Sequence, residues 1–96
     1  MARPSALPPE AVADGLTHLH GWEGDTTGIA RTVEAPSFLS GVRLVTDVAR
    51  IAEEMDHHPD IDIRWRKVRV ALTTHEANGL TNRDLDLATE IEAIGS

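Results

Sequence analysis

The sequence predicts an α+β fold, in which three helices pack on one face of a four-stranded antiparallel sheet in the order αββαββα. Apolar residues recur at spacings of three and four in three segments, and they alternate with polar residues in the segments between. The connections between segments are short, which favours antiparallel neighbours over right-handed parallel crossovers. At 96 residues, the chain is expected to form a single domain over residues 1–96.

The first helix is expected over residues 8–19, after a loose tail of residues 1–7. Proline suits a first helical turn, because the N–H that it lacks has no partner there. Val12 and Leu16 fall at helical spacing, and Gly21 supplies a stop signal.

A β-hairpin is expected next, with strands at residues 22–25 and 29–34 around a loop at 26–28. In the second strand, alternate positions that share one face are occupied by Ile29, Arg31 and Val33.

The central helix carries the strongest helical pattern in the chain. Ser37 is a natural N-cap for it, and the helix is expected to run to about Asp56. Apolar residues recur at spacings of four and three at Phe38, Val42, Val45, Ala49 and Ala52.

From residue 61 the hydrophobic period is two, which is typical of strands. One parity is shared by Ile61, Ile63 and Trp65, and the opposite parity by Val68, Val70 and Leu72. Because one extra residue moves every later side chain to the other face, this slip predicts two strands separated by a turn or bulge at residues 66–67.

The last helix begins with a capping signal. Thr81 is the expected N-cap, and Asp84 stands at the third helical position, from which its carboxylate reaches back to the cap. Leu80 and Leu85 form the expected hydrophobic staple, and the stripe continues through Ala88 and Ile91.

The composition excludes several classes of function. Sixteen acidic against nine basic residues give a formal net charge of -7, and the scattered basic residues argue against nucleic-acid binding. With no cysteine, disulfides and thiolate chemistry are excluded, and a cytoplasmic location is expected. No apolar run approaches the roughly 20 residues of a membrane span, so no membrane association is expected. A chain this short buries a modest core, which favours self-association.

Three of the five histidines lie in two short stretches that carry the chemistry. His57 and His58 follow the expected end of the central helix, and Pro59 extends the backbone at His58, so the two rings should point in different directions. His75 follows the last expected strand, in a loop of the kind that displays reactive groups. Histidine gives and takes protons near neutrality, which indicates proton transfer on a small molecule.

Ordinary structural roles compete with this interpretation. A histidine pair at a helix end is often only solvated, Asp84 is explained by the capping pattern alone, and Glu53 is explained as an exposed helix residue. Zinc bound by the three histidines and a carboxylate is disfavoured, because adjacent histidines rarely ligate one ion. No metal site is therefore expected.

Taken together, these residues resemble the pterin-4a-carbinolamine dehydratase family, also known as the dimerisation cofactor of a homeodomain transcription factor. The family signature is matched by Glu53, His57-His58-Pro59, Trp65, His75 and Asp84, and the segment 74–81 resembles its second active-site segment. The resemblance spans nearly the whole chain. At Asn78, many members carry a glycine, and asparagine tolerates the left-handed conformation better than most residues.

The resemblance implies a hydro-lyase that dehydrates 4a-hydroxytetrahydropterin to quinonoid dihydropterin, which recycles the tetrahydrobiopterin oxidised by aromatic amino-acid hydroxylases. It implies that His57 and His75 are the principal acid and base, that His58 holds the substrate and that Asp84 orients a histidine or the helix N-terminus. The implied pterin-binding residues are Asp56, His57, His58, Pro59, Thr73, Thr74, His75 and Glu76, with Glu53 and Trp65 in support.

The resemblance further implies that no metal or organic cofactor is needed, and that the chain is a homodimer or homotetramer. The alternative is a pterin-dehydratase-like module that serves in dimerisation or assembly, with weak or no activity.

Overall fold

A computed structural model describes residues 5–95 and confirms the predicted α+β fold. The elements in chain order are α1 (Pro9–Leu16), β1 (Trp22–Asp25), β2 (Gly28–Glu34), α2 (Phe38–Met55), β3 (Asp60–Arg64), β4 (Lys67–Leu72), the 3-10 turn η1 (His75–Ala77) and α3 (Asn82–Gly95). The strands form one antiparallel sheet in the order β1-β2-β4-β3. Among residues 5–95, no helix combines the length and the apolar character that crossing a membrane requires.

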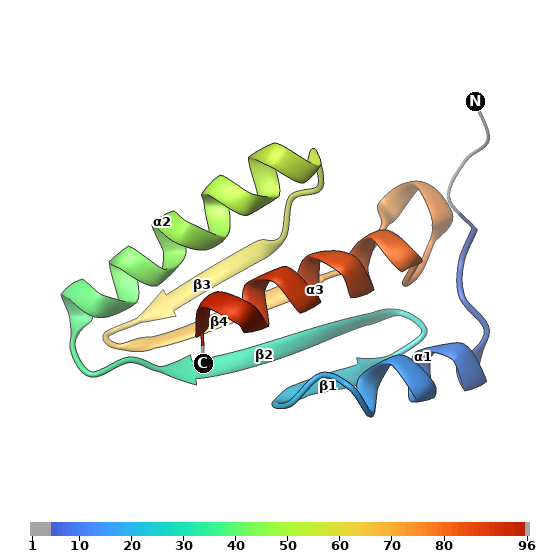
Figure 1. Cartoon of the computed structure of the whole chain (residues 1–96), viewed down its shortest axis with the longest axis horizontal. Helices are drawn as coiled ribbons and strands as arrows, with labels where there is room; N and C mark the ends of the chain where they lie inside the picture. The colour runs from blue at the N-terminus through green and yellow to red at the C-terminus, as the bar shows by residue number, and fades with distance from the viewer. Residues whose placement is uncertain (1–4, 96) are drawn as a thin grey trace.

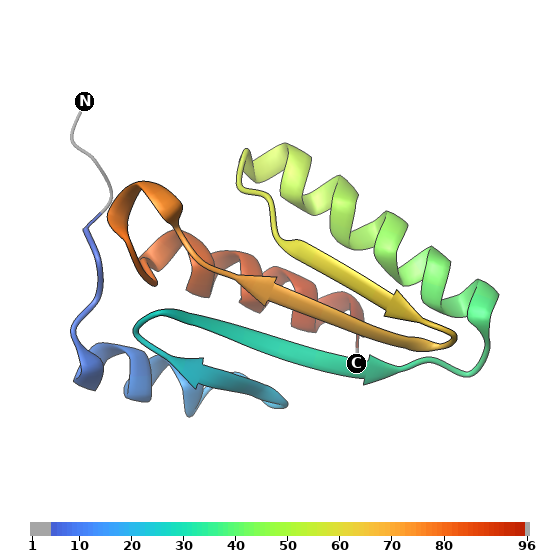
Figure 2. The same ribbon diagram turned by 180° about the vertical axis from the view of Figure 1, so that it is seen from behind.

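The core lies between the sheet and the helices. In Figures 1 and 2, α2 runs along β3, α3 crosses the middle of the sheet, and α1 lies beside β1. The sheet contributes alternate residues of β2 and β4, as the period of two predicted, and the helices cover them. The buried apolar residues include Ile29, Val68, Val70 and Leu72 from these strands and Val12, Val48, Ala52, Leu87, Ala88 and Ile91 from the helices. Each large side chain buried in this way contributes about 1.5–3 kcal/mol.

The face of α2 that packs on the sheet differs from the predicted pattern. Phe38 and Val42 are 54% and 38% exposed, whereas Gly41 and Val48 are buried. A methyl group added at Gly41 would lie 3.3–3.4 Å from side-chain atoms of the strands beneath, so the glycine lets the helix approach the sheet closely. This approach turns Phe38 and Val42 outward, and because glycine is not an apolar side chain the hydrophobic pattern did not mark it.

The first helix is shorter than predicted, because it ends at Leu16 and residues 17–19 form a turn. Gly15 lies against α3, where an added methyl group would come within 2.9 Å of Leu85. The part of the predicted loose tail that the structure describes is attached, since Leu7 N–H donates to the Leu80 carbonyl at 2.8 Å. The rest of that prediction, residues 1–4, lies outside the described residues.

The predicted boundaries around α2 and the second hairpin hold closely. Ser37 caps α2, since its hydroxyl accepts a hydrogen bond from Ser40 N–H at 3.1 Å. The turn between β3 and β4 falls at Trp65 and Arg66, one residue earlier than predicted. Trp65 takes a left-handed conformation there, with φ of 55°.

Candidate active site

The end of α2 separates the two adjacent histidines. Asp56 adopts the left-handed conformation, with φ of 50° and ψ of 44°, and His57 N–H then bonds to the Ala52 carbonyl at 3.1 Å. This geometry resembles the common left-handed helix ending, which reverses the chain direction. It leaves the His57 side chain buried, with 8% of the residue exposed, whereas His58 is exposed.

The buried His57 imidazole is paired with Asp84. The Nε2 atom of His57 lies 2.5 Å from Oδ1 of Asp84, a residue with no exposed surface. The other carboxylate oxygen, Oδ2, accepts Thr81 N–H at 2.9 Å and the Thr74 hydroxyl at 2.7 Å. Both proposed interactions of Asp84 are therefore present together: one oxygen caps α3 and the other contacts a histidine.

His58 lies on the surface beside Glu53. Its Nε2 atom is 3.3 Å from Glu53 Oε1, and both side chains are more than half exposed. Exposed pairs of this kind stabilise a protein by about 0–1 kcal/mol, so the contact orients the ring more than it stabilises the fold. Glu53, which the signature singled out, thus contacts one of the three histidines directly.

His75 is the first residue of η1 and is exposed. The loop around it is closed by two backbone hydrogen bonds between Thr74 and Gly79, of 3.1 and 3.3 Å. Asn78 occupies the left-handed region, with φ of 56°, which fits the tolerance expected of asparagine. A methyl group at Gly79 would lie 2.7 Å from the Thr26 carbonyl oxygen, so this position requires glycine.

Arg83 connects the segments that carry the three histidines. Its Nη2 atom donates to the Asp56 carbonyl at 2.8 Å, and Nη1 lies 3.7 Å from Glu76 Oε2. The end of α2 and the η1 turn therefore meet at the start of α3. The sequence analysis missed this residue, although a cation in the first turn of a helix opposes the helix dipole and could have signalled a tertiary role.

Trp65 does not support this site within one chain. It lies in the β3–β4 turn, and β3 separates it from the histidines by about 16 Å at roughly 3.3 Å per residue. The side chain is 71% exposed, and the Arg66 guanidinium lies over its ring, 5.0 Å from the centroid. Spacing along the sequence placed Trp65 near the motif, but Trp65 follows the extended β3. The β3–β4 turn lies at the opposite end of β3 from the end of α2 (Figure 1).

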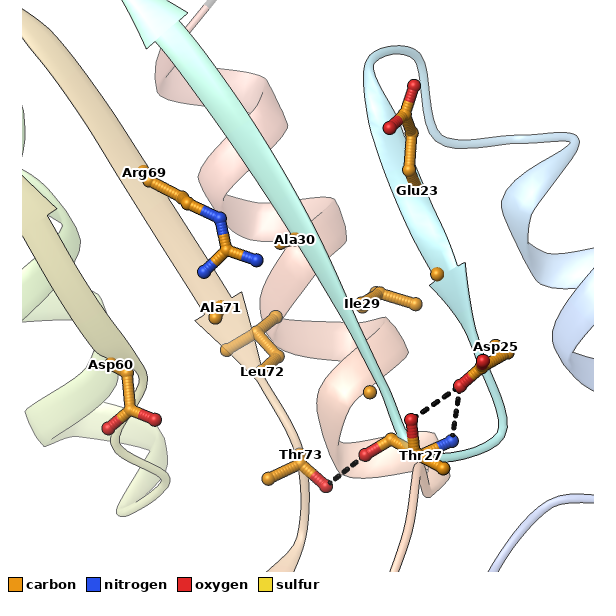
Figure 3. Close-up of a pocket in the computed structure, with 12 residues that line it drawn as sticks. Glu23, Asp25, Thr27, Ile29, Ala30, Asp60, Arg69, Ala71, Leu72 and Thr73 are labelled. Carbon is orange, nitrogen blue, oxygen red and sulfur yellow. Dashed lines mark hydrogen bonds between the residues drawn. The ribbon is translucent and has the colours of Figure 1, made fainter.

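A hollow of about 370 Å³ opens on the side of the sheet away from the helices (Figure 3). The small side chains of Ala30 and Ala71 form part of its wall, and Arg69 projects beside them. Its rim includes Asp60 and Thr73, which stand two residues from His58 and His75 in the sequence. The hollow thus adjoins the histidine-bearing segments, although no histidine lines it.

The rim of this hollow also contains an Asx-type turn. The Thr27 hydroxyl and N–H donate to Asp25 Oδ1 at 2.5 and 2.8 Å (Figure 3). The hydrogen bond from the Thr27 hydroxyl has the larger effect, and the one from Thr27 N–H the smaller. Both lower the pKa of Asp25 below its ordinary value because they favour the charged form. The neighbouring Thr73 hydroxyl donates to the Thr27 carbonyl at 2.8 Å.

A metal site needs several imidazole or carboxylate ligands grouped around one point. Between residues 5 and 95, no three histidine, aspartate or glutamate side chains are grouped so that they could hold a metal ion.

The Asp84 network yields a prediction about stability. Asp84→Ala removes the cap of α3 and leaves the buried His57 ring without its partner, so we expect the free energy of unfolding in urea to fall by about 2–4 kcal/mol. Asp86→Ala removes an exposed carboxylate from the same helix and serves as the matched control, expected within about 0.5 kcal/mol of the parent. Equal effects of the two substitutions would contradict the network.

The Asp25 turn yields a prediction about pH. Because the pKa of Asp25 is lowered in the folded chain, ionised Asp25 stabilises the fold. This stabilisation is complete above the ordinary carboxyl pKa, and it is lost as the pH falls through the lowered pKa of the folded chain. Thr27→Val removes the hydroxyl donor, and an NMR titration of the Asp25 carboxyl should show its pKa rising toward the ordinary value. Thr32→Val, which changes an exposed threonine of β2, should leave the pKa of Asp25 unchanged. An unmoved pKa after Thr27→Val would exclude the hydroxyl as the cause.

Comparison with known proteins agrees with the sequence signature. The model of the family described as pterin 4 alpha carbinolamine dehydratase matches residues 5–94. A relative from Roseiflexus sp. (strain RS-1) is 51% identical over 83 residues, covering 86% of this chain and 89% of that protein. A relative from Mycolicibacterium smegmatis is 48% identical over 90 residues, covering 94% and 96%. Both carry the name "Putative pterin-4-alpha-carbinolamine dehydratase".

Two solved structures share the fold. The crystal structure of a transcriptional coactivator/pterin dehydratase from Brucella melitensis superposes with a TM-score of 0.91 at 29% identity, covering 96% of this chain and all of that one. A pterin dehydratase-like protein identified as a RuBisCO assembly factor in the alpha-carboxysome gives a TM-score of 0.67 at 18% identity, over 82% and 94% of the two chains, which is a likeness of fold alone. The match over almost the whole sequence and the shared fold confirm that this chain belongs to the pterin-4a-carbinolamine dehydratase family.

Proposed function

We propose that this chain is a hydro-lyase that dehydrates a 4a-hydroxytetrahydropterin to the quinonoid dihydropterin and water. The observation that carries the proposal is the buried contact between His57 and Asp84, because it holds an imidazole in one orientation near the exposed His58 and the segment that carries His75. Membership of the family and the names of the relatives support a pterin as the substrate.

The reaction requires two proton transfers and no redox step. The bond between C4a and the hydroxyl oxygen breaks, and the oxygen leaves as water after it receives a proton. A ring nitrogen loses its proton, and the electron pair of that N–H bond forms the new C=N bond. A histidine acid and a histidine base on opposite sides of the leaving group therefore suffice.

His57 is suited to be one of these two groups. An ionised carboxylate accepts hydrogen bonds and donates none, so Asp84 requires a proton on the Nε2 atom that faces it. The neutral ring then has an unprotonated Nδ1, which is the atom that exchanges a proton with the substrate. Asp84 acts through His57 and is a positioning residue.

The remaining roles belong to the segments that Arg83 connects. We assign His75 as the second acid/base group and His58, held by Glu53, as the group that binds the substrate or the leaving hydroxyl. Glu76 is exposed and pairs with the adjacent N–H donors of the pterin's amino-pyrimidinone edge. The pterin also lies against Asp56, Pro59 and Thr73, and the proposed physiological role is the recycling of tetrahydrobiopterin.

The assignment of histidines can be tested by following quinonoid product from enzymatically generated 4a-hydroxytetrahydropterin. We expect His57→Ala and His75→Ala each to lower kcat by ~100-fold or more, as loss of a general acid or base does. His20→Ala, an exposed histidine after α1, is the matched control and should turn over like the parent. A parent chain no faster than buffer would refute the dehydratase, and fully active histidine variants would refute their roles.

A second function, as an assembly or dimerisation module, is favoured by the outer face of α2. Phe38 and Leu39 are 54% and 57% exposed in its first turn, which is unusual for large apolar side chains grouped on one helix. We propose that the chain forms a homodimer or homotetramer through this face. The similar structure from Brucella melitensis is named a transcriptional coactivator/pterin dehydratase, and this name supports partner binding by this chain.

This assembly can be tested by light scattering coupled to size exclusion. The parent should elute at the mass of two or four chains, and Leu39→Glu should shift it toward the monomer because a charge is placed in the contact. Thr89→Glu, on the exposed side of α3, should not change the mass. A monomeric parent would exclude self-association, and assembly without dehydration would make this function the primary one.

A further inference from the structure

We infer that Thr74 is a positioning residue, whose buried hydroxyl keeps Asp84 an ionised acceptor and thereby fixes the tautomer of His57. The family resemblance placed Thr74 among the residues that bind the pterin, whereas its side chain contacts Asp84 and Thr81. The catalytic meaning of the inference rests on the proposed dehydratase activity, but the tautomer itself does not.

The direction of each hydrogen bond follows from the chemistry of the groups. The Asp84 carboxylate can only accept, so Thr74 donates its single hydroxyl proton to Oδ2 over 2.7 Å. The Thr74 oxygen, 2.8 Å from the Thr81 hydroxyl, must then accept from it. The Thr81 oxygen in turn accepts Arg83 N–H at 3.2 Å. The chain of donors therefore runs one way, from the first turn of α3 to the carboxylate.

Burial prevents water from replacing these contacts. Thr74 and Thr81 are each 1% exposed, and Asp84 is 0% exposed. With its only proton committed to Asp84, the Thr74 hydroxyl has none to donate to a substrate. Its role is therefore exerted through the carboxylate and the His57 ring that the carboxylate faces.

The hydrogen bonds that Asp84 accepts decide whether its carboxylate stays ionised beside His57. Oδ2 receives two hydrogen bonds, from Thr74 and from Thr81 N–H, and these stabilise a charge that burial alone would disfavour. Without the Thr74 hydroxyl, Oδ2 keeps only the hydrogen bond from Thr81 N–H, and the protonated acid becomes more favourable. An Asp84 that has taken up a proton from water can donate it to Nε2 of His57, so the neutral ring then carries its own proton on Nδ1. This removes the atom that accepts a proton from the substrate.

The test uses the full-length protein with ¹⁵N-labelled histidine, at a pH where the His57 ring is neutral. The parent should show the Nε2–H form of His57 alone. Thr74→Val, which keeps the branched shape, should populate the Nδ1–H form and lower kcat by ~10-fold or more with KM within about two-fold. Thr74→Ser should restore both readouts, because it returns the hydroxyl. Thr89→Val removes a hydroxyl that donates to the Leu85 carbonyl outside the network, and should change neither.

The possible outcomes separate this inference from the proposed function. A folded Thr74→Val chain that keeps the Nε2–H form would overturn the role of Thr74, whatever its activity. A parent chain without dehydratase activity would refute the function and leave the tautomer result to stand by itself. If Thr74→Val does not fold, Thr74→Ala, which also lacks a side-chain donor, replaces it: an unaltered tautomer and kcat in that variant would equally overturn the inference.

Discussion

A carboxylate with no exposed surface must have its charge balanced by hydrogen bonds, and Asp84 meets this requirement by drawing together three separate segments. It binds the start of its own helix through Thr81 N–H, the η1 loop through Thr74, and the end of α2 through His57. Two of these partners, His57 and Thr74, are buried polar side chains, and they need the carboxylate as their own hydrogen-bond partner. The relative placement of these segments therefore depends on a polar group as well as on the apolar core.

The apolar core and the candidate site lie in different parts of the fold. The side of β4 that faces the helices is buried along its length, at Val68, Val70 and Leu72. This apolar contact holds α2 and α3 against the sheet. The candidate site lies where α2 ends and α3 begins, at the edge of that core. The open face of the sheet carries charged residues such as Arg69, together with the hollow beside Thr73.

Local signals in the sequence predicted most of the fold. The capping residues Ser37 and Thr81, the alternation in β2 and the phase slip before β4 each depend on neighbours within a few residues, and each is confirmed to within one or two positions. The orientation of α2 was not predictable in this way, because it depends on a close approach at Gly41 to another element. Arg83 and Trp65 show the same limit: one reaches a tertiary partner, and the other is carried away by an extended strand.

The residues that form the Asp84 hydrogen-bond network are unevenly spaced along the sequence. Residues 74–84 supply the carboxylate and both hydroxyls, whereas the imidazole comes from a position 27 residues earlier. Closing a loop of about ten residues takes ~10–100 ns, far less than long-range docking requires. The contacts that orient the acceptor therefore span only a short loop, whereas the contact with the histidine at the end of α2 spans a much longer stretch of chain.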